Sequence, residues 1–349
     1  MTLLACRRLQ QRTDPALAQL RLTDSASDDL DHVVTIGKAA GEPLRVGILQ
    51  VLREESYSVS ELCELFAVAQ PALSHHLKIL HQAGLVAKRR EGNSIFYRRA
   101  CVPGRQSQQD LYLALLKTID QASLAPAIVK RAAQIYAARR ARSEEFFTCN
   151  ATQFTAQQAR ICEPAIYTDT VKDILEKTGI VDKHKCRDRH ALEVGPGDGH
   201  LLAWLAETFE QVTGIDSSAG MLEKARQKTL RIPRVSLSHC DFMELPVPSS
   251  FHLIIAAMVI HHLASPAAFF QQARRLLESD GVLIIAELCR HDQQWANAVC
   301  GDQWLGFEPR ELNQWALRVG FHTIDSQFLA QKNGFRIQIH CYHLTNSTE

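Results

Sequence analysis

Apolar positions recur at helical spacing through the front of the chain. From Leu30 to Leu52 this spacing predicts two helices. Ser58 and Glu61, three residues apart, form a capping pair that opens a further helix, because each side chain can accept from a free backbone N–H of the other. Pro71 then marks the first turn of the next helix, where a missing N–H breaks no hydrogen bond.

The segment after these helices alternates and turns at Glu91-Gly92-Asn93, which predicts a β-hairpin. Helix, turn, helix and hairpin in this order predict a winged helix-turn-helix domain over residues 31–103, preceded by a weakly ordered polar leader over 1–30. Residues 104–162 again carry helical spacing. They predict a helix suited to self-association at about 108–123, followed by a helical linker.

The back of the chain, residues 163–349, alternates strand and helix patterns. Strand candidates are residues 191–194, 212–215, 235–238, 253–257 and 282–286, with helical patterns between them. This alternation predicts a parallel, doubly wound sheet. The closing segment "FRIQIHCYHL" also alternates, and we expect it to add an edge strand.

Composition is ordinary for a globular protein of 349 residues, with 46% hydrophobic and 22% charged residues, and the length suits two domains. No apolar stretch approaches the roughly 20 residues that span a bilayer, so we expect no membrane segment. The start of the chain shows no secretory signal pattern, which favours a cytoplasmic protein.

Charge is distributed unevenly. Up to Asn150 the chain has 20 Lys and Arg against 15 Asp and Glu, and beyond it 19 against 23. A basic front half suits a polyanionic partner such as nucleic acid, although random drift of charge is the alternative.

The second helix of the helix-turn-helix carries the features of a DNA-reading helix. Its apolar stripe is predicted to face the core, which leaves a polar outer face made of Gln70, Ser74, His75 and Lys78. Such side chains can contact base edges and phosphates in a major groove. On the hairpin, three consecutive basic residues are predicted to contact phosphate or the minor groove: Lys88, Arg89 and Arg90. A winged helix used only for protein contacts is the alternative.

A glycine turn follows the first strand of the back half, at Gly195, Gly197 and Gly199. Without Cβ atoms, such a turn lets backbone N–H groups approach a ligand. Asp216 ends the next strand, where an acid can accept hydrogen bonds from ribose hydroxyls. Glu193 precedes the turn and would repel a pyrophosphate, so it favours a ligand that carries a cation.

Residues 30–99 resemble the ArsR-type winged-helix repressors in "GEPLRVGILQVL", in the S-x-H-L of Ser74–Leu77 and in the "AGLV" that opens the wing. The resemblance implies a homodimer that binds a palindromic operator in double-stranded DNA. Many members sense metals through a C-x-C pair, whereas this chain keeps only Cys63 and has Leu65 at the second position. Metal sensing is therefore not expected, and the signal must come from elsewhere.

Four later segments, "EVGPGDG", "GIDSSAGMLEKAR", "CDFMELP" and "RRLLESDGVLIIAEL", resemble class I S-adenosylmethionine-dependent methyltransferases over about residues 165–345. The resemblance implies an α/β Rossmann-like, seven-stranded domain that follows the α+β winged helix-turn-helix domain. It also implies S-adenosylmethionine or S-adenosylhomocysteine as ligand, held by the glycine turn, Glu193, Asp216, Ser217, Asp241 and Phe242. A scaffold with an empty site is the alternative.

Catalysis has a weaker signal. His261 and His262 in "MVIHHL" are candidates to orient or deprotonate a substrate, and a packing pair is an equal alternative. The aromatic segment 291–307 is either a lid or a packing element. The strings "HKCRDRH" and "HCYH" suggest a metal site, but in a strand His340 would point away from Cys341 and His343, and the ten cysteines are scattered without a C-x-x-C, so no metal site is expected.

The two halves together predict a DNA-binding regulator whose methyltransferase-like domain binds an adenosyl ligand as effector. Resemblance to adenosylhomocysteine-responsive repressors makes methionine-cycle genes the expected targets. The alternative is an active small-molecule methyltransferase that regulates its own gene. Methylation of DNA bases is disfavoured, because the N/D-P-P-Y/F motif is absent.

Overall fold

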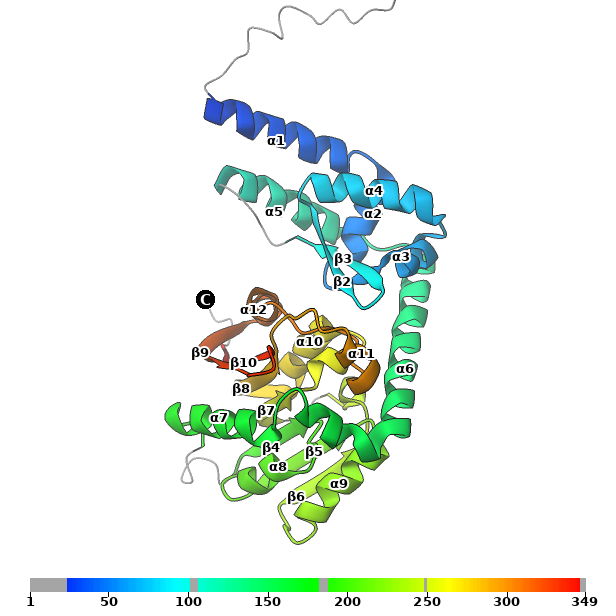
Figure 1. Cartoon of the computed structure of the whole chain (residues 1–349). Helices are drawn as coiled ribbons and strands as arrows, with labels where there is room; N and C mark the ends of the chain where they lie inside the picture. The colour runs from blue at the N-terminus through cyan, green and yellow to red at the C-terminus, as the bar shows by residue number, and fades with distance from the viewer. Residues whose placement is uncertain (1–23, 101–105, 182–187, 248–249, 346–349) are drawn as a thin grey trace, which may run out of the picture.

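The computed structural model describes residues 24–100, 106–181, 188–247 and 250–345, and places two domains at the two ends of one long helix (Figure 1). The leader up to residue 23, the boundary near residue 103 and most of "HKCRDRH" lie outside the described residues. Helix formation begins at Asp24, within the segment expected to be leader.

The front domain is a winged helix. Its helices are α1 (Asp24–Ala40), α2 (Pro43–Val51), α3 (Val59–Phe66) and α4 (Gln70–Gln82). Its three strands, β1 (Tyr57–Ser58), β2 (Val86–Glu91) and β3 (Ser94–Arg99), form a sheet in the order β1-β3-β2. The predicted capping pair is confirmed: Ser58 Oγ accepts from the Glu61 N–H, and the Glu61 carboxylate accepts from the Ser58 N–H.

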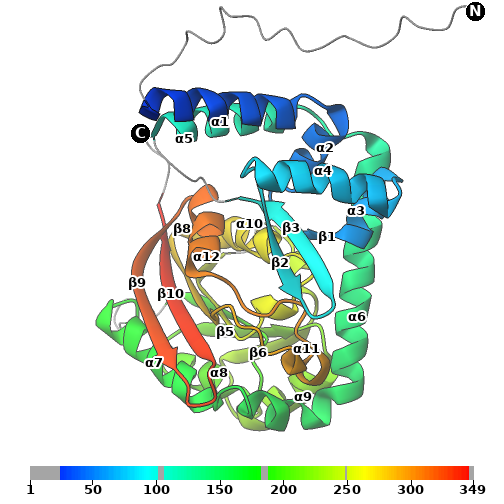
Figure 2. The ribbon, with the colours of Figure 1, turned by 45° about the horizontal axis from the view of Figure 1, so that its top comes forward.

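Two helices follow the wing. Helix α5 (Gln106–Gln121) packs beside α1, and both lie at the end of the molecule far from the second domain (Figures 1 and 2). Helix α6 (Pro126–Ala159) has 34 residues and is therefore about 50 Å long. It runs down the side of the molecule from the winged helix to the second domain, so one rigid element contacts both (Figure 1).

The second domain is built on a seven-stranded sheet in the order β6-β5-β4-β7-β8-β10-β9. The strands are β4 (His190–Val194), β5 (Gln211–Asp216), β6 (Val235–His239), β7 (Phe251–Ala257), β8 (Leu277–Leu288), β9 (Phe321–Ala330) and β10 (Arg336–Leu344). Strands β6, β5, β4, β7 and β8 pair in parallel, and β10 is antiparallel to both β8 and β9.

Helices cover both faces of this sheet, as a doubly wound architecture requires. One hydrophobic core lies under α7 (Pro164–Lys177), α8 (His200–Leu205), α9 (Ala219–Thr229) and the short α11 (Trp295–Cys300). The other lies under α10 (Pro266–Leu276) and α12 (Pro309–Arg318). Two 3₁₀ turns, η1 (Phe242–Glu244) and η2 (Ile260–His262), follow β6 and β7.

The expectation that the closing segment forms an edge strand is wrong. Strand β10 lies inside the sheet between β8 and β9, and β9 is the edge strand. The alternation of polar and apolar residues suggested an exposed face, but the polar residues of β10 are buried and form hydrogen bonds with other parts of the domain. Gln338 donates to the carbonyls of Leu288 and Phe307, and His340 bonds Ser326 Oγ at 2.8 Å.

Among the described residues, no helix is both long enough and apolar enough to cross a membrane.

Candidate functional site

A cavity opens at the carboxyl ends of β4, β5 and β7, where parallel strands of doubly wound folds place ligands. Seven of the eight residues expected to hold the adenosyl ligand line it: Glu193, Gly195, Gly197, Asp216, Ser217, Asp241 and Phe242. Its remaining walls come from the segment 257–265 after β7 and from helices α6 and α7. The cavity therefore spans the sheet edge and the helix that links the domains.

The three glycines of the turn have different parts. Gly197 has φ +56°, and no described atom lies within 4 Å of where a Cβ would stand, so the cavity passes close to its backbone. Gly195 lies against Val259, which a Cβ would meet at 2.5 Å. Gly199 lies outside the cavity lining: at φ +79°, it lets α8 pack against α9, where a Cβ would stand 3.0 Å from the Ala225 carbonyl.

Glu193 supplies the strongest electrostatic feature of the cavity. Its side chain is buried, and Oε2 has no hydrogen-bond partner within the described part of the chain. Burial, with the charge of Asp198 added, raises the pKa of Glu193 well above its usual range. A buried carboxyl with one oxygen left without a partner is stabilised by a bound cation, which the ammonium or sulfonium of an adenosyl ligand would supply.

Asp216 is held at the end of β5 by its own turn. Its Oδ1 accepts from the Ser218 N–H at 2.8 Å, which fixes the carboxylate beside the cavity. Burial raises the pKa of Asp216 to about 6. The group is therefore ionised at neutral pH and able to accept from two ribose hydroxyls.

Asp241 and Phe242 form the side of the cavity nearest to α6. Asp241 Oδ1 accepts from the Met243 N–H at 2.8 Å, and its Oδ2 lies 3.1 Å from Nε of Arg140 on α6. The Phe242 ring stacks on Phe269 at 4.5 Å between centroids. This wall thus joins the sheet domain to the linker helix through an ion pair.

The two histidines of "MVIHHL" occupy different environments. His262 lines the cavity, and its ring meets Phe147 of α6 edge-on at 4.9 Å. Burial and then the neighbouring His261 lower the pKa of His262 well below its usual range, so its ring is neutral. His261 lies outside the cavity lining and contacts Glu287 instead, so His262 alone of the pair is placed to meet a substrate.

The outer face of α4 is free for a partner in this structure. Gln70, Ser74, His75 and Lys78 are all exposed, whereas Leu73, Leu77 and Leu80 are fully buried in the winged-helix core. This is the division of faces that the sequence predicted.

The wing is placed differently from the expectation. Lys88 and Arg90 are exposed, but Arg89 is only 8% exposed and points into the second domain. It ion-pairs with Glu91, donates to the Gly306 carbonyl at 3.1 Å and lies 3.4 Å from Glu311. In this arrangement Arg89 cannot reach a phosphate, because its guanidinium is buried between the domains and paired with Glu91 and Glu311.

Arg139 of α6 forms the second half of the domain junction. Its guanidinium donates to both carboxylate oxygens of Glu61, at 2.9 and 2.8 Å, and to the Ser56 carbonyl at 2.8 Å. A further bond runs to the Ala264 carbonyl at 3.0 Å, on the segment that lines the cavity. One buried side chain thus joins the helix-turn-helix, the linker helix and the cavity wall.

The aromatic segment 291–307 packs at this junction rather than over the cavity, which none of its residues lines. Trp304 is 2% exposed, contacts Phe96 of the wing edge-on at 5.1 Å and donates to the Leu263 carbonyl. The guanidinium groups of Arg89 and Arg139 lie 5.5 and 5.2 Å from its ring centre. The structure therefore favours packing over a lid.

The residues that the sequence did not reveal are those of α6. Tyr136, Arg140 and Phe147 line the cavity although they precede the methyltransferase-like segment. Their only signal was the adjacent Arg139-Arg140 pair in a helix without a clear apolar stripe.

Two family models match the chain. One, described as "Bacterial regulatory protein, arsR family", matches residues 42–88, and another, described as "Methyltransferase domain", matches residues 192–285. The matches fall on the winged helix and on the seven-stranded sheet, which confirms both resemblances. The chain carries an ArsR-type DNA-binding domain fused to a methyltransferase domain of the S-adenosylmethionine-dependent type.

Curated relatives match one domain each. A probable S-adenosylmethionine-dependent methyltransferase of Mycolicibacterium smegmatis is 32% identical over 104 residues, covering 30% of this chain and 39% of that protein. The HTH-type transcriptional repressor SmtB of Mycobacterium tuberculosis is 41% identical over 71 residues, covering 20% of this chain and 53% of the repressor. Each alignment therefore spans well under two thirds of the relative's length.

Solved structures of methyltransferases are similar to part of this chain at low identity. A 1,6-didemethyltoxoflavin-N1-methyltransferase of Burkholderia thailandensis has TM-score 0.47 and 18% identity, covering 64% of this chain and 93% of that chain. The N-methyltransferase NodS of Bradyrhizobium japonicum has TM-score 0.38 and 18% identity, covering 45% and 78%.

Proposed function

We propose that this fusion of an ArsR-type DNA-binding domain to a methyltransferase domain is a homodimeric transcriptional regulator, with S-adenosylmethionine or S-adenosylhomocysteine as its effector. The ligand would occupy the cavity beside Glu193 and Asp216. Its target genes are proposed to be those of the methionine cycle, where these two compounds report methylation status.

The cavity supports this proposal by its chemistry. Glu193 offers the unpartnered Oε2 of a buried carboxyl for the cationic end of the ligand, Asp216 offers a carboxylate for the ribose, and Gly197 leaves room that a Cβ would fill. An adenosylmethionine bound there would supply an activated methyl group. Adenosylhomocysteine would occupy the same site without one.

The single observation that carries the effector role is the pair of neighbouring residues on α6. Arg140 reaches Asp241 in the cavity wall, and Arg139 holds Glu61 at the start of the helix-turn-helix. A ligand that moves the cavity wall or α6 therefore moves the DNA-binding domain. Such a ligand shifts DNA affinity only if it binds the two arrangements unequally, and a difference of about 1–3 kcal/mol changes affinity about 5- to 150-fold.

A homodimer is proposed because an operator-binding winged helix reads two half-sites. Helices α1 and α5 carry a surface suited to self-association, with exposed apolar side chains at Leu30, Val33, Val34 and Leu113. Light scattering on the Val34→Glu and Leu113→Glu double variant tests this surface. A dimer that persists unchanged would exclude it.

The regulatory role is tested with the full chain and an operator selected in vitro from random duplexes. Calorimetry measures affinity for each adenosyl compound, and fluorescence anisotropy measures operator affinity with and without saturating ligand. We expect Asp216→Ala to weaken ligand binding at least about tenfold, because two hydrogen bonds are lost, and to abolish the DNA response. Asp169→Ala, an exposed acid on α7, is the matched control. Equal operator affinity with and without ligand would refute the effector role.

An active small-molecule methyltransferase is the second candidate, favoured by the placement of His262, Tyr136 and Phe147 on the cavity wall. Transfer of a labelled methyl group to a small molecule in a cell extract, lost in His262→Gln, would establish it. A cofactor that remains intact while operator affinity changes would favour the regulator alone.

A further inference from the structure

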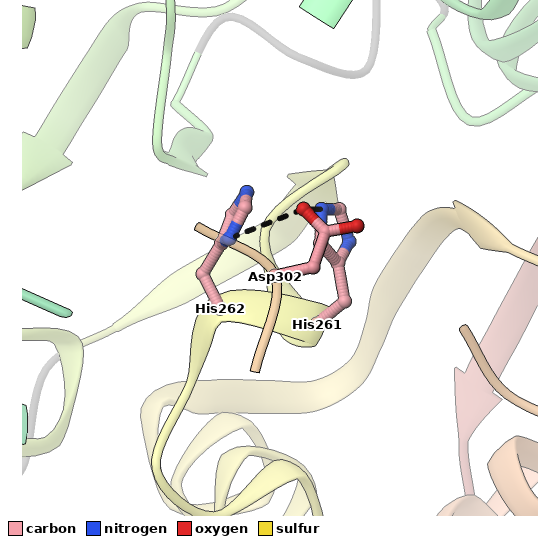
Figure 3. Close-up of side chains that lie close together, drawn as sticks. All are labelled: His261, His262 and Asp302. Atoms are coloured by element: carbon pink, nitrogen blue, oxygen red, sulfur yellow. Dashed lines mark ion pairs between the residues drawn. The ribbon is translucent and has the colours of Figure 1, made fainter. Parts of the chain in front are cut away.

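Two imidazoles and two carboxylates converge at a point away from the domain surface. His261 and His262 come from η2, and Asp302 follows α11 (Figure 3). Glu287 lies near the end of β8. His261 Nε2 lies 3.7 Å from Asp302 Oδ1, and His262 Nδ1 lies 3.9 Å from the same oxygen. One donor atom from each histidine and from Asp302 fits within 4.8 Å of the others.

Asp302 is the anomaly of this cluster. It is 1% exposed, and neither of its carboxylate oxygens has a hydrogen-bond partner in the described ranges. Its ion-pair partners there are the two histidines alone, at distances too long for direct hydrogen bonds. A buried carboxylate without donors is strongly disfavoured, so a cation belongs beside it.

Glu287 holds His261 in the form that a metal requires. Its Oε1 lies 2.5 Å from Nδ1 of His261, and its Oε2 accepts from the His261 N–H at 3.1 Å. A proton held on Nδ1 by Glu287 leaves Nε2, which lies 3.7 Å from Asp302 Oδ1, as the nitrogen that a metal would bind. A carboxylate behind a histidine is the usual outer partner of a metal-binding imidazole.

Metal binding needs a local contraction of donor atoms that now lie within 4.8 Å of one another, and His262 Nδ1 must give up its 3.3 Å contact with the Gly301 carbonyl oxygen. Metal–nitrogen and metal–oxygen bonds of about 2.0–2.1 Å place tetrahedral ligands about 3.3 Å apart, slightly closer than the 3.7 and 3.9 Å observed. Cys300 is not part of the set, because its thiol faces the Gln157 carbonyl at 3.7 Å and lies outside the group of donor atoms that gather within 4.8 Å. Nitrogen and oxygen ligands without thiolate favour zinc or another divalent first-row ion.

We propose that His261 Nε2, His262 Nδ1 and the Asp302 carboxylate bind one divalent transition-metal ion, zinc by preference, with Glu287 as the outer partner of His261. The three ligands leave a fourth position for water. This ion neutralises the two carboxylates and removes the unsatisfied state of Asp302. It differs from the C-x-C site of the metal-sensing repressors, which would lie in the winged-helix domain at Cys63.

The position of the site gives the ion a structural consequence. Asp302 begins the segment that meets the wing, and the N–H groups of Gln303 and Trp304 both donate to the His261 carbonyl, at 3.0 and 3.1 Å. An ion bound by both η2 and Asp302 therefore fixes the position of the segment that carries Trp304 and Leu305. The Leu305 N–H in turn donates to the Glu91 carboxylate of the wing at 2.8 Å.

The site is tested by direct metal binding to the full chain. Protein stripped with a chelator is titrated with zinc chloride in competition with a chromophoric chelator, and elemental analysis counts the bound ions. We expect one zinc per chain, with affinity reduced about 100-fold or more in Asp302→Asn and about 10- to 100-fold in Glu287→Gln. Cobalt(II) added instead should give the visible absorption of a low-symmetry nitrogen and oxygen site.

Cys300→Ser is the matched control, because it changes a potential ligand beside Asp302 and should leave zinc affinity unchanged. Near-ultraviolet circular dichroism checks that each variant is folded. If Asp302→Asn does not fold, His262→Gln provides the second test. The competing explanation is a proton shared by His261 between Glu287 and Asp302. Absence of stoichiometric zinc and cobalt binding by the folded wild type, or zinc affinity that Asp302→Asn and His262→Gln leave unchanged, would overturn the proposal.

Discussion

Replacing Arg139 by Gln removes the charge that joins the two domains. The wild-type side chain is 4% exposed and forms a two-bond ion pair with Glu61. Burial raises the pKa of Glu61, but the hydrogen bonds and charge of Arg139 outweigh it and hold that pKa below its usual range. Without Arg139, the Glu61 carboxylate stays half-buried and loses its principal partner.

The magnitude follows from these contacts. Removing one partner of a buried ion pair costs about 3–5 kcal/mol, because the remaining charge stays uncompensated. Glu61 is 17% exposed and keeps its capping bonds to Ser58, so we expect a loss near the lower end, about 3 kcal/mol. Ligand affinity should change little, because Arg139 does not line the cavity.

The assay combines urea unfolding with operator binding at zero and saturating ligand. Arg139→Gln should lower the free energy of unfolding and reduce the ligand-dependent change in operator affinity. Arg142→Gln, an exposed neighbour on α6, is the control and should stay within about 0.5 kcal/mol of wild type. A double-mutant cycle with Glu61→Gln should give a coupling energy of about 0.5–3 kcal/mol. A loss below about 1 kcal/mol together with an undiminished ligand response would refute the reasoning.

Three further predictions concern the cavity and the wing. We propose that the ionised form of Asp216 binds ribose hydroxyls, and burial raises its pKa to about 6, so affinity for adenosyl ligands should fall about tenfold from pH 7 to pH 5. Calorimetry across this range, with a flat profile for Asp216→Asn, checks it. Gly197→Ala should lower ligand affinity and reduce the free energy of unfolding by only about 1 kcal/mol. Gly199→Ala, whose Cβ would meet the backbone of α9, should reduce the free energy of unfolding in urea by more. Lys88→Ala should lower operator affinity and reduce its dependence on salt by about one unit of slope, whereas Arg89→Ala should mainly destabilise the docked wing. Equal salt slopes for Lys88→Ala and wild type would contradict the wing contact.

Local patterns predicted the elements well. Ser58 and Glu61 cap α3 as expected, and the apolar stripe of α4 is buried. Each depends on residues a few positions apart, so the sequence displays them directly. Seven expected ligand-binding residues line one cavity for a similar reason, since parallel strands bring their carboxyl ends together wherever they stand in the chain.

The order of the strands in the sheet was harder to predict from the sequence. The pattern of β10 indicated an edge strand, because alternating polar residues normally face water. In the structure those residues find partners on neighbouring strands, which only the assembled sheet provides. Strand β9 was not predicted at all, although its half-exposed pattern is that of a true edge.

The sequence by itself determined that a winged helix-turn-helix of the ArsR type and a glycine turn of the methyltransferase type share one chain, because both are short motifs with local physical causes. Only the tertiary structure decided which distant residues meet. Arg89 pairs with Glu311, Arg139 with Glu61, and Asp302 approaches His261, although the members of the first two pairs are 222 and 78 residues apart. Such contacts depend on where folded surfaces meet, and neither spacing nor composition along the chain records that meeting.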